Sequence, residues 1–358
     1  MSLLFCIRPA TRNIGNDIIN RATSELIYQV FGGATGIVNI PAIKGPQFGG
    51  FTVRQVYDVN RFADGVALGG GNLFENGEVT VEPHALAALR VPLMLIGLSH
   101  GRIYGRDGKL LERTDGMPPD TIRQLAAMAS HILVRDAATQ ERLQRLTDHK
   151  ITLAGCPTLF MDANPVGFAN DGSVLVSIRH PNRMSVPPTL QWRVAEDLRR
   201  LLAALRGEFG DKVVLVCHDY ADIEFASAFP EVPLVYFDDV DHYIDSLRRC
   251  FLNVAYRLHA FLPCLAFGTP TIHLSYDERG KSMLSTTGMA EWDIDLMQGF
   301  DVVQEVLARA RNIDRFHTLR QTAQPGIEAM RQITIAALKA FSEEVADYRA
   351  AQKKVPNA

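Results

Sequence analysis

The chain has 358 residues, of which 47% are hydrophobic and 22% are charged, and its net charge at neutral pH is −3. This length favours two domains, and so small a charge gives no electrostatic reason to expect binding to nucleic acid or to an anionic membrane. The five cysteines show no paired spacing, and no apolar run reaches the ~20 residues of a membrane-spanning helix. We therefore expect a cytoplasmic protein without disulfides or a transmembrane segment.

The first part of the chain repeats the order strand, polar loop, helix. Apolar runs predict buried strands at 2–7, 64–68, 91–98, 130–134 and 151–154. Amphipathic patterns predict helices at 18–31, at 121–128 and from Asp136 to Leu146. This alternation is typical of a parallel sheet flanked by helices.

Two loops in this part are candidates for ligand contact. The loop at 11–17 holds one glycine and precedes a helix, whose N-terminus presents free N–H groups to a polar ligand. The loop at 69–72 holds three successive glycines, which let backbone N–H groups approach a ligand closely. A tight turn packed against a neighbouring strand explains these glycines equally well. Their spacing is not G-x-G-x-x-G, so we do not predict dinucleotide binding.

The segment at 161–172 is rich in Asn, Asp, Pro and Gly and predicts a linker, after which the pattern restarts. Strands are predicted at 173–178, 212–217, 232–237, 251–256 and 271–274, and helices at 190–209, 222–228, 241–249, 260–267, 301–311 and after Pro325. The prediction is an α/β fold of two Rossmann-like domains that face each other across a cleft, a GT-B-like architecture. The N-terminal domain would span 1–165, the C-terminal domain 170–323, and a C-terminal helix at 324–358 would pack back.

Charged side chains follow the predicted strands of the second domain. Arg257 and His259 stand two apart at the start of a buried helix, where their desolvation is costly unless a partner is present, and an anion suits both. Arg179 follows another strand and is read either as an anion ligand or as part of a solvated turn. His218 is read either as a site residue or as a partly buried neighbour of a helix-capping aspartate. No HExxH motif, cysteine cluster or ligand-like spacing of carboxylates is present, so we predict no metal.

Several short motifs follow one another in this order: N-I-G-N-D at 13–17, G-G-G-N at 69–72, R-D at 135–136, S-I-R at 177–179, R-L-H at 257–259, G-T-P at 268–270 and Y-x-x-x-x-K at 276–281. Together they resemble the polysaccharide pyruvyl transferase family, over roughly residues 10–290. The resemblance implies a GT-B-like fold, no metal or cofactor, and phosphoenolpyruvate as the donor substrate. It implies that the enolpyruvyl carbons pass to a saccharide acceptor, forming a ketal with two hydroxyls and releasing phosphate.

The resemblance also implies roles for individual residues. Arg179, Arg257 and His259 would be catalytic, with His259 as the general acid, and Arg179, Arg257 and Lys281 would bind the donor. The acceptor side would comprise Asn13, Asp17, Gly70, Gly71, Asn72 and His218. Ketal formation itself requires that an acceptor hydroxyl lose a proton, and Asp17 and His218 are the candidates to take it. The first loop lacks a glycine directly before its aspartate, and the Pro-Asp-Pro-like form is missing near 155–157, which leaves the acceptor open.

Two other functions remain open from the sequence. One is a GT-B glycosyltransferase that uses a nucleotide sugar, and the other is a non-catalytic sugar-binding component of polysaccharide assembly. The acceptor sugar, its linkage and the oligomeric state are not predicted. A lipid-linked acceptor would bring the protein into peripheral contact with a membrane.

Overall fold

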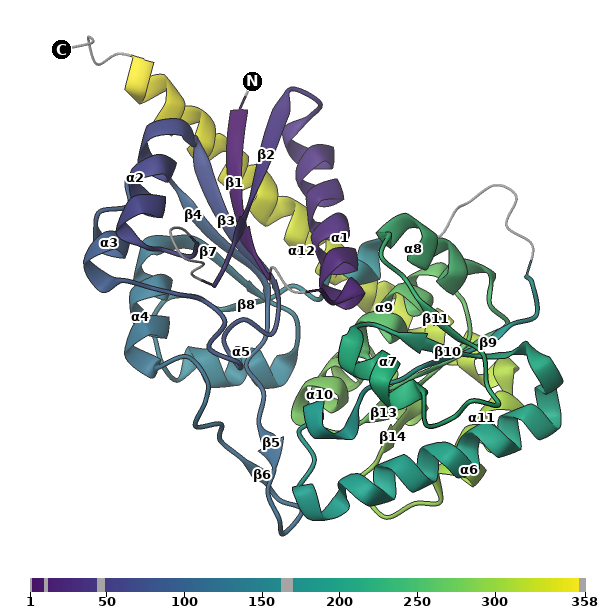
Figure 1. The fold of residues 1–358 in the computed structure, drawn as a ribbon. Coiled ribbons are helices and arrows are strands. Elements are labelled where there is room, and N and C mark those ends of the chain that lie inside the picture. Colours follow the sequence, from purple (N-terminus) through teal and green to yellow (C-terminus); the bar gives the residue numbers. More distant parts are fainter. Residues whose placement is uncertain (1, 10–11, 44–48, 162–169, 354–358) are drawn as a thin grey trace.

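A computed structural model describes residues 2–9, 12–43, 49–161 and 170–353. Within these ranges the chain forms two lobes, each built around a parallel sheet of six strands, as Figure 1 shows. Most of the predicted linker at 161–172, one residue of the predicted loop at 11–17 and the last residues of the predicted segment 324–358 lie outside the described residues.

The first lobe contains a sheet with the strand order β2-β1-β3-β4-β7-β8. Its strands are β1 (Ser2–Arg8), β2 (Thr35–Pro41), β3 (Gly65–Gly71), β4 (Leu93–Leu98), β7 (Ala129–Val134) and β8 (Thr152–Leu153). Its helices are α1 (Ile14–Phe31), α2 (Val53–Phe62), α3 (Pro83–Ala87), α4 (Pro119–Met128) and α5 (Ala137–Gln144). A short antiparallel pair, β5 (Ile103–Tyr104) and β6 (Leu110–Leu111), extends from this lobe towards the second.

The second lobe contains a sheet with the strand order β11-β10-β9-β12-β13-β14. Its strands are β9 (Val174–Ser177), β10 (Val213–Cys217), β11 (Leu234–Tyr236), β12 (Leu252–Ala255), β13 (Thr271–Ser275) and β14 (Asp293–Asp295). Its helices are α6 (Gln191–Phe209), α7 (Tyr220–Ala226), α8 (Val240–Arg249), α9 (Leu258–Phe267), α10 (Glu278–Thr286) and α11 (Val302–Ala310). The predicted pattern of two successive parallel α/β units is therefore confirmed.

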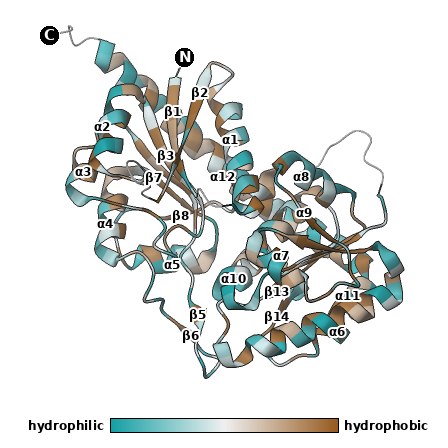
Figure 2. Ribbon diagram, in the orientation of Figure 1, coloured by the Kyte–Doolittle hydropathy of each residue, from teal (hydrophilic) through white to brown (hydrophobic). Residues whose placement is uncertain are grey.

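Both sheets are buried on their two faces, which explains why their strands read as continuous apolar runs. Along β9, Val174 and Val176 belong to one hydrophobic cluster and Leu175 to another on the opposite face, as the two-residue period of a strand requires. Figure 2 shows the same distribution, with hydrophobic residues along the strands and hydrophilic residues on the outer faces of the helices.

Two helices pack against both lobes. Helix α1 places Ile14 and Ile18 in a cluster with residues of the second sheet, and Leu26 and Ile27 in a cluster with residues of the first. The terminal helix α12 (Ile313–Lys353) starts in the second lobe and runs across to the first, as its yellow ribbon shows in Figure 1. The lobes are thus held by shared helices on one side of the molecule.

Several local predictions are corrected by the structure. Helix α1 begins at Ile14 with Asn13 as its N-cap, so Asn16 and Asp17 lie in its first turn and not in a loop. The Y-x-x-x-x-K motif at 276–281 runs into the start of α10, where Asp277 accepts hydrogen bonds from the backbone of Arg279 and Gly280. The last helix begins at Ile313, and Pro325 lies inside it.

Candidate active site

The order of the strands in each sheet locates a crevice. In the first sheet β1 and β3 are neighbours whose connections leave in opposite directions, and in the second sheet the same holds for β9 and β12. Ligands of open α/β sheets bind outside the carboxyl ends of such strand pairs. Arg179 and Arg257 follow β9 and β12, whereas Asn13 and Asn72 follow β1 and β3. The topology therefore brings both pairs of predicted residues to the junction of the lobes.

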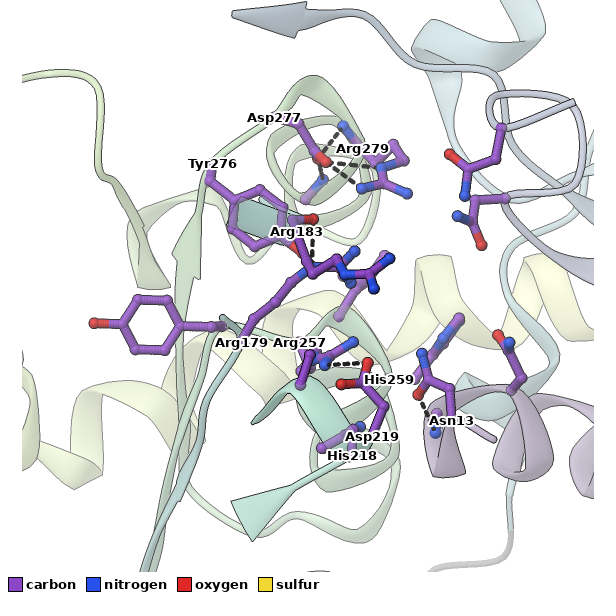
Figure 3. A pocket seen from close by; sticks show the side chains of 18 of the residues that line it. Asn13, Arg179, Arg183, His218, Asp219, Arg257, His259, Tyr276, Asp277 and Arg279 are labelled. Atoms are coloured by element: carbon purple, nitrogen blue, oxygen red, sulfur yellow. Dashed lines mark hydrogen bonds and ion pairs between the residues drawn. The ribbon is translucent and has the colours of Figure 1, made fainter. Parts of the chain in front are cut away.

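A cavity of about 380 Å³ lies at this junction. Residues of the first lobe that line it include Arg12, Asn13, Gly15, Asn16, Asn72, Asn76, Glu78 and Arg135. Residues of the second lobe that line it include Arg179, Arg183, His218, Asp219, Tyr220, Arg257, His259, His273, Tyr276, Asp277 and Arg279. Figure 3 shows the arginines of the second lobe at the centre of the cavity, with Asn13 approaching from the first lobe.

Arg257 is the N-cap residue of α9 and is 4% exposed. Its Nε donates to the carbonyl of Ile178 at 3.1 Å, and its Nη2 pairs with Asp219 at 3.0 Å and with the fully buried Asp222. Burial opposes the charge of Arg257, but these carboxylates outweigh it and raise the pKa of its guanidinium. The predicted partner of Arg257 is therefore present in the protein itself, and little of its charge remains for a ligand.

Arg179 lies beside Arg257 and has no such carboxylate. Its Nε donates to the carbonyl of Arg183 at 2.7 Å, and its guanidinium lies 5.8 Å from the centre of the Tyr276 ring. Among the described residues no carboxylate forms an ion pair with it. Its pKa is lowered by burial and by the neighbouring arginines 257 and 279, although Tyr276 and Asp222 counteract this. An anion in the cavity would relieve this unfavourable charge.

Arg135 reaches the cavity from the first lobe. It follows β7, is only 2% exposed, and its Nε has no hydrogen-bond partner within the described ranges. Its Nη1 lies 3.5 Å from Nε2 of His259. Burying a guanidinium is costly when no carboxylate lies beside it to balance its charge. Arg135 therefore marks the cavity as an anion site.

His259 lies in the first turn of α9, between Arg135 and the second lobe. Burial and the charges of arginines 135, 279 and 257 lower its pKa to about 3. Because Arg135 can only donate a hydrogen bond, Nε2 of His259 is the acceptor and the neutral ring carries its proton on Nδ1. With this pKa the ring of His259 is neutral at pH 7.

The start of α10 brings Arg279 to the cavity. Its guanidinium pairs with Asp277 and lies 3.5 Å from Glu75, which is fully buried in the first lobe. Burial raises the pKa of Glu75, and Arg279 is the first of the charges that counteract this rise. Arg279 thus joins the two lobes at the edge of the cavity.

Lys281 lies two residues further along α10 and does not line this cavity. Its Nζ pairs with Asp295 at 2.5 Å and lies 3.0 Å from the hydroxyl of Tyr104, beside a separate cavity lined by α5 and α10. The structure therefore brings Arg279, and not the predicted Lys281, to the arginine cluster.

The predicted acceptor residues divide into two groups. Asn13, Asn72 and His218 line the cavity, whereas Asp17, Gly70 and Gly71 do not. Asp17 lies 3.8 Å from Arg8, and burial raises the pKa of its carboxyl. Gly70 and Gly71 have positive φ angles of 94° and 79°, and an added Cβ at either would approach α1. These glycines serve a close approach between strand and helix.

The N-terminus of α9 adds to the attraction for anions. The aspartates 219 and 277 cap α7 and α10 with their side chains, but Arg257 makes no side-chain cap for α9. The first N–H groups of α9 therefore face the cavity with the positive end of the helix dipole. No cluster of three or more metal-ligating side chains occurs in the described part of the chain.

Sequence reasoning did not assign several residues of the cavity. Arg135 appeared only as part of a short motif, yet its place directly after a buried strand was the same signal that selected Arg179. Arg279 was overlooked because the lysine two positions later was preferred. Asn76 and Glu78 follow the glycine-rich strand β3, and apart from that position nothing in the sequence marks them as site residues.

Comparisons with known proteins agree with this geometry. A family model described as polysaccharide pyruvyl transferase matches residues 13–278, a range that contains every predicted site residue except Lys281. No curated protein sequence matches the chain.

Solved structures resemble the chain in fold. UDP-GlcNAc 2-epimerase from Neisseria meningitidis bound to UDP-GlcNAc has a TM-score of 0.56 and 11% identity, covering 94% of this chain and 99% of that one. MnaA from S. aureus in complex with UDP has a TM-score of 0.55 and 11% identity, covering 89% and 90%. A variant of the wall teichoic acid polymerase TagF has a TM-score of 0.52 and 11% identity, covering 98% and 90%. These matches confirm the predicted GT-B-like fold. Within the described ranges, no helix is both long and apolar enough to span a membrane.

Proposed function

The chain belongs to the polysaccharide pyruvyl transferase family, and on that basis we propose that it transfers the pyruvyl group of phosphoenolpyruvate to a saccharide. The product is a ketal with two hydroxyls of the acceptor, and phosphate is released. The observation that carries the proposal is the cluster of guanidinium groups around His259, in which Arg135 and Arg179 form no ion pair with a carboxylate of the described residues.

The donor matches this cluster in charge. Phosphoenolpyruvate carries a carboxylate and a phosphate, and guanidinium groups bind both in a bidentate manner. Arg179 and Arg135 supply the charge that the protein does not already neutralise, and the uncapped N-terminus of α9 supplies free N–H groups. Arg257 and Arg279 are held by aspartates, so their role is to fix the loops after β12 and β13.

Ketal formation requires two proton transfers. One proton is added to the methylene carbon, which becomes the methyl group, and one is added to the departing phosphate; both come from the two acceptor hydroxyls. His259 is the proposed general acid, although burial and the neighbouring guanidinium groups lower its pKa to about 3. The anionic donor offsets the guanidinium charges that lower the pKa of His259, so its binding favours the protonated, donating form.

The acceptor is proposed to lie against the first lobe. Asn13, Asn16, Asn72 and Asn76 line this side of the cavity. Side-chain amides both donate and accept hydrogen bonds, as the hydroxyls of a sugar require. The donor side of the cavity is cationic, and the acceptor side is rich in amides. This pairing suits the transfer of a pyruvyl group from an anionic donor to a neutral saccharide.

The experiment is to incubate the protein with phosphoenolpyruvate and a panel of saccharide acceptors, measuring phosphate release and product mass. We expect phosphate release that depends on one acceptor, with a mass gain of one pyruvyl ketal. Phosphoenolpyruvate should also raise the melting temperature of the protein. Stabilisation by UDP- or GDP-sugars instead, without phosphate release from phosphoenolpyruvate, would support the nucleotide-sugar glycosyltransferase. Acceptor binding without turnover of either donor would support the sugar-binding component.

A further inference from the structure

His218 directly follows β10 and borders the cavity, and the residue is 0% exposed. Its Nε2 lies 3.1 Å from the hydroxyl of Tyr243. Its Nδ1 is buried and has no hydrogen-bond partner among the described residues. A buried polar atom without a partner is rare in folded proteins and requires an explanation. Which ring nitrogen carries the proton decides what this atom can do.

The other ring nitrogen has a partner, because Nε2 lies against the buried hydroxyl of Tyr243. A phenol hydroxyl both donates and accepts, so this contact alone is compatible with either tautomer. Buried N–H groups without an acceptor are rarer in folded proteins than buried acceptors without a donor. The unpartnered Nδ1 therefore favours the tautomer whose proton is on Nε2.

In this tautomer the hydroxyl oxygen of Tyr243 accepts a hydrogen bond from Nε2 of His218. A neutral imidazole that is protonated on Nε2 has a lone pair on Nδ1. Burial, together with the charges of Arg257 and Arg179, lowers the pKa of His218 well below its usual value, which keeps the ring neutral. The unpartnered Nδ1 is then a proton acceptor.

Gly15 bounds the space beside this atom from the first lobe. A Cβ at Gly15 would lie 3.4 Å from Nδ1 of His218, 3.4 Å from Cβ of His259 and 3.1 Å from Oδ1 of Asn13. Its φ angle is not positive, so the backbone does not require glycine at this position. Glycine instead leaves the space between the two histidines and Asn13 free of a side chain. That space belongs to the wall where the acceptor is proposed to lie.

We propose that His218 is the general base that takes the proton of an acceptor hydroxyl through Nδ1. This inference rests on the proposed function. The O–H bond of the hydroxyl breaks and an Nδ1–H bond forms while the hydroxyl oxygen bonds to the central carbon of the donor. As the bond from that carbon to the phosphate oxygen breaks, the proton passes from Nδ1 to the phosphate. The ring returns to its neutral form, and no other reactant is consumed.

The test uses three variants of the full chain. His218→Gln removes the base, Tyr243→Phe removes the hydrogen-bond partner of Nε2, and Gly15→Ala fills the space beside Nδ1. Their matched controls are His149→Gln and Tyr57→Phe, which change exposed side chains, and Gly207→Ala, which adds a Cβ to a helical glycine with no atom within 4 Å.

We expect His218→Gln to lower kcat for phosphate release by about 100-fold or more, the usual contribution of a general base, with the Kd for phosphoenolpyruvate within threefold of the unaltered protein. Gly15→Ala should lower kcat and raise KM for the acceptor, while the control variants keep the original values. A His218→Gln variant that releases phosphate within threefold of the original rate would overturn the proposal.

The tautomer is measured separately by ¹⁵N NMR of the imidazole of His218, which needs no turnover. We expect the proton on Nε2 in the original protein and a mixture of tautomers in Tyr243→Phe. A proton on Nδ1 in the original protein would overturn the proposal even if His218→Gln were inactive. If the original protein released no phosphate from phosphoenolpyruvate with any acceptor, the proposed function and the base role would both fail. Normal turnover in His218→Gln would remove the base role alone.

Discussion

Arg135 of the first lobe and His259 of the second meet across the cavity, with Nη1 of the arginine 3.5 Å from Nε2 of the imidazole. The two residues come from different sheets, so this contact exists only when the lobes are together. It keeps His259 neutral in the absence of a ligand and leaves a buried guanidinium ready for an anion. The first two predictions concern this pair.

Replacing Arg135 by Gln should raise the pKa of His259 from its value of about 3, because a positive charge that disfavours the imidazolium is removed. An NMR titration of the His259 ring measures the change. Arg145→Gln, at an exposed position on the same lobe, should leave that pKa unchanged. An unchanged pKa in Arg135→Gln would show that burial alone sets the pKa of His259.

Binding of phosphoenolpyruvate should be accompanied by proton uptake at His259. The donor raises the pKa of a group that is neutral in the free protein, so the complex holds a proton that the free protein lacks. Affinity should therefore increase as the pH falls through the pKa of the complex towards the lower pKa of the free protein. Calorimetry in buffers of different ionisation enthalpy measures the uptake, and His259→Gln is the control for protonation of the donor itself. Equal uptake by both proteins would contradict the prediction.

Arg279 and Lys281 should differ in their effect on the donor. Arg279→Ala is expected to weaken phosphoenolpyruvate binding by tenfold or more, because the residue lines the cavity and fixes Asp277. Lys281→Ala should change the affinity by less than twofold, because the residue lines a separate cavity and not this one. Calorimetric Kd values, with the melting temperature of each variant as a folding check, decide the matter. A larger loss of phosphoenolpyruvate affinity in Lys281→Ala than in Arg279→Ala would support Lys281 as the donor ligand, as predicted from the sequence.

Glu278 holds the lobes together at the start of α10. It accepts hydrogen bonds from the backbone N–H and guanidinium of Arg102 and, at 2.9 Å, from Arg142, and its side chain is 8% exposed. Glu278→Gln should lower the free energy of unfolding by about 1–3 kcal/mol at pH 7, the usual cost of breaking such contacts.

The effect of Glu278→Gln should depend on pH. These partners lower the pKa of Glu278, so its contribution is complete above the pKa of the unfolded chain and is lost as the pH falls through the lower pKa of the folded state. Urea denaturation at pH 7 and at pH 3 measures the difference. Glu141→Gln, an exposed change on α5, serves as the control. A penalty of the same size at both pH values would argue against the ionic contribution.

The fold was predictable because the buried strands are continuous apolar runs separated by helical patterns. The strands of the first sheet precede the predicted linker at 161–172 and those of the second sheet follow it. Strands β2 and β14 were missed because β2 has exposed residues and β14 is only the three residues Asp-Ile-Asp. Their strand conformation comes from pairing with a neighbour, which a local pattern does not show.

The site was predictable in position and less so in electrostatics. Arg179, Arg257 and His259 follow strands or begin a helix, and the topology brings them together as expected. The sequence did not show that Asp219 and Asp222 neutralise Arg257, because ion pairing depends on how α7 is oriented against β12. Nor did it show that Arg135 crosses from the first lobe, since a contact between domains leaves no trace in local spacing.

Helix α12 has a consequence for how the protein loses its structure. Phe316 and Ile327 of this helix pack in the core of the second lobe, while Leu338, Phe341 and Val345 pack in the core of the first. Neither lobe can keep its complete core if the other melts and releases its part of the helix. We therefore expect a single calorimetric transition for the full chain, in which the calorimetric and van't Hoff enthalpies agree, in place of two separate domain transitions.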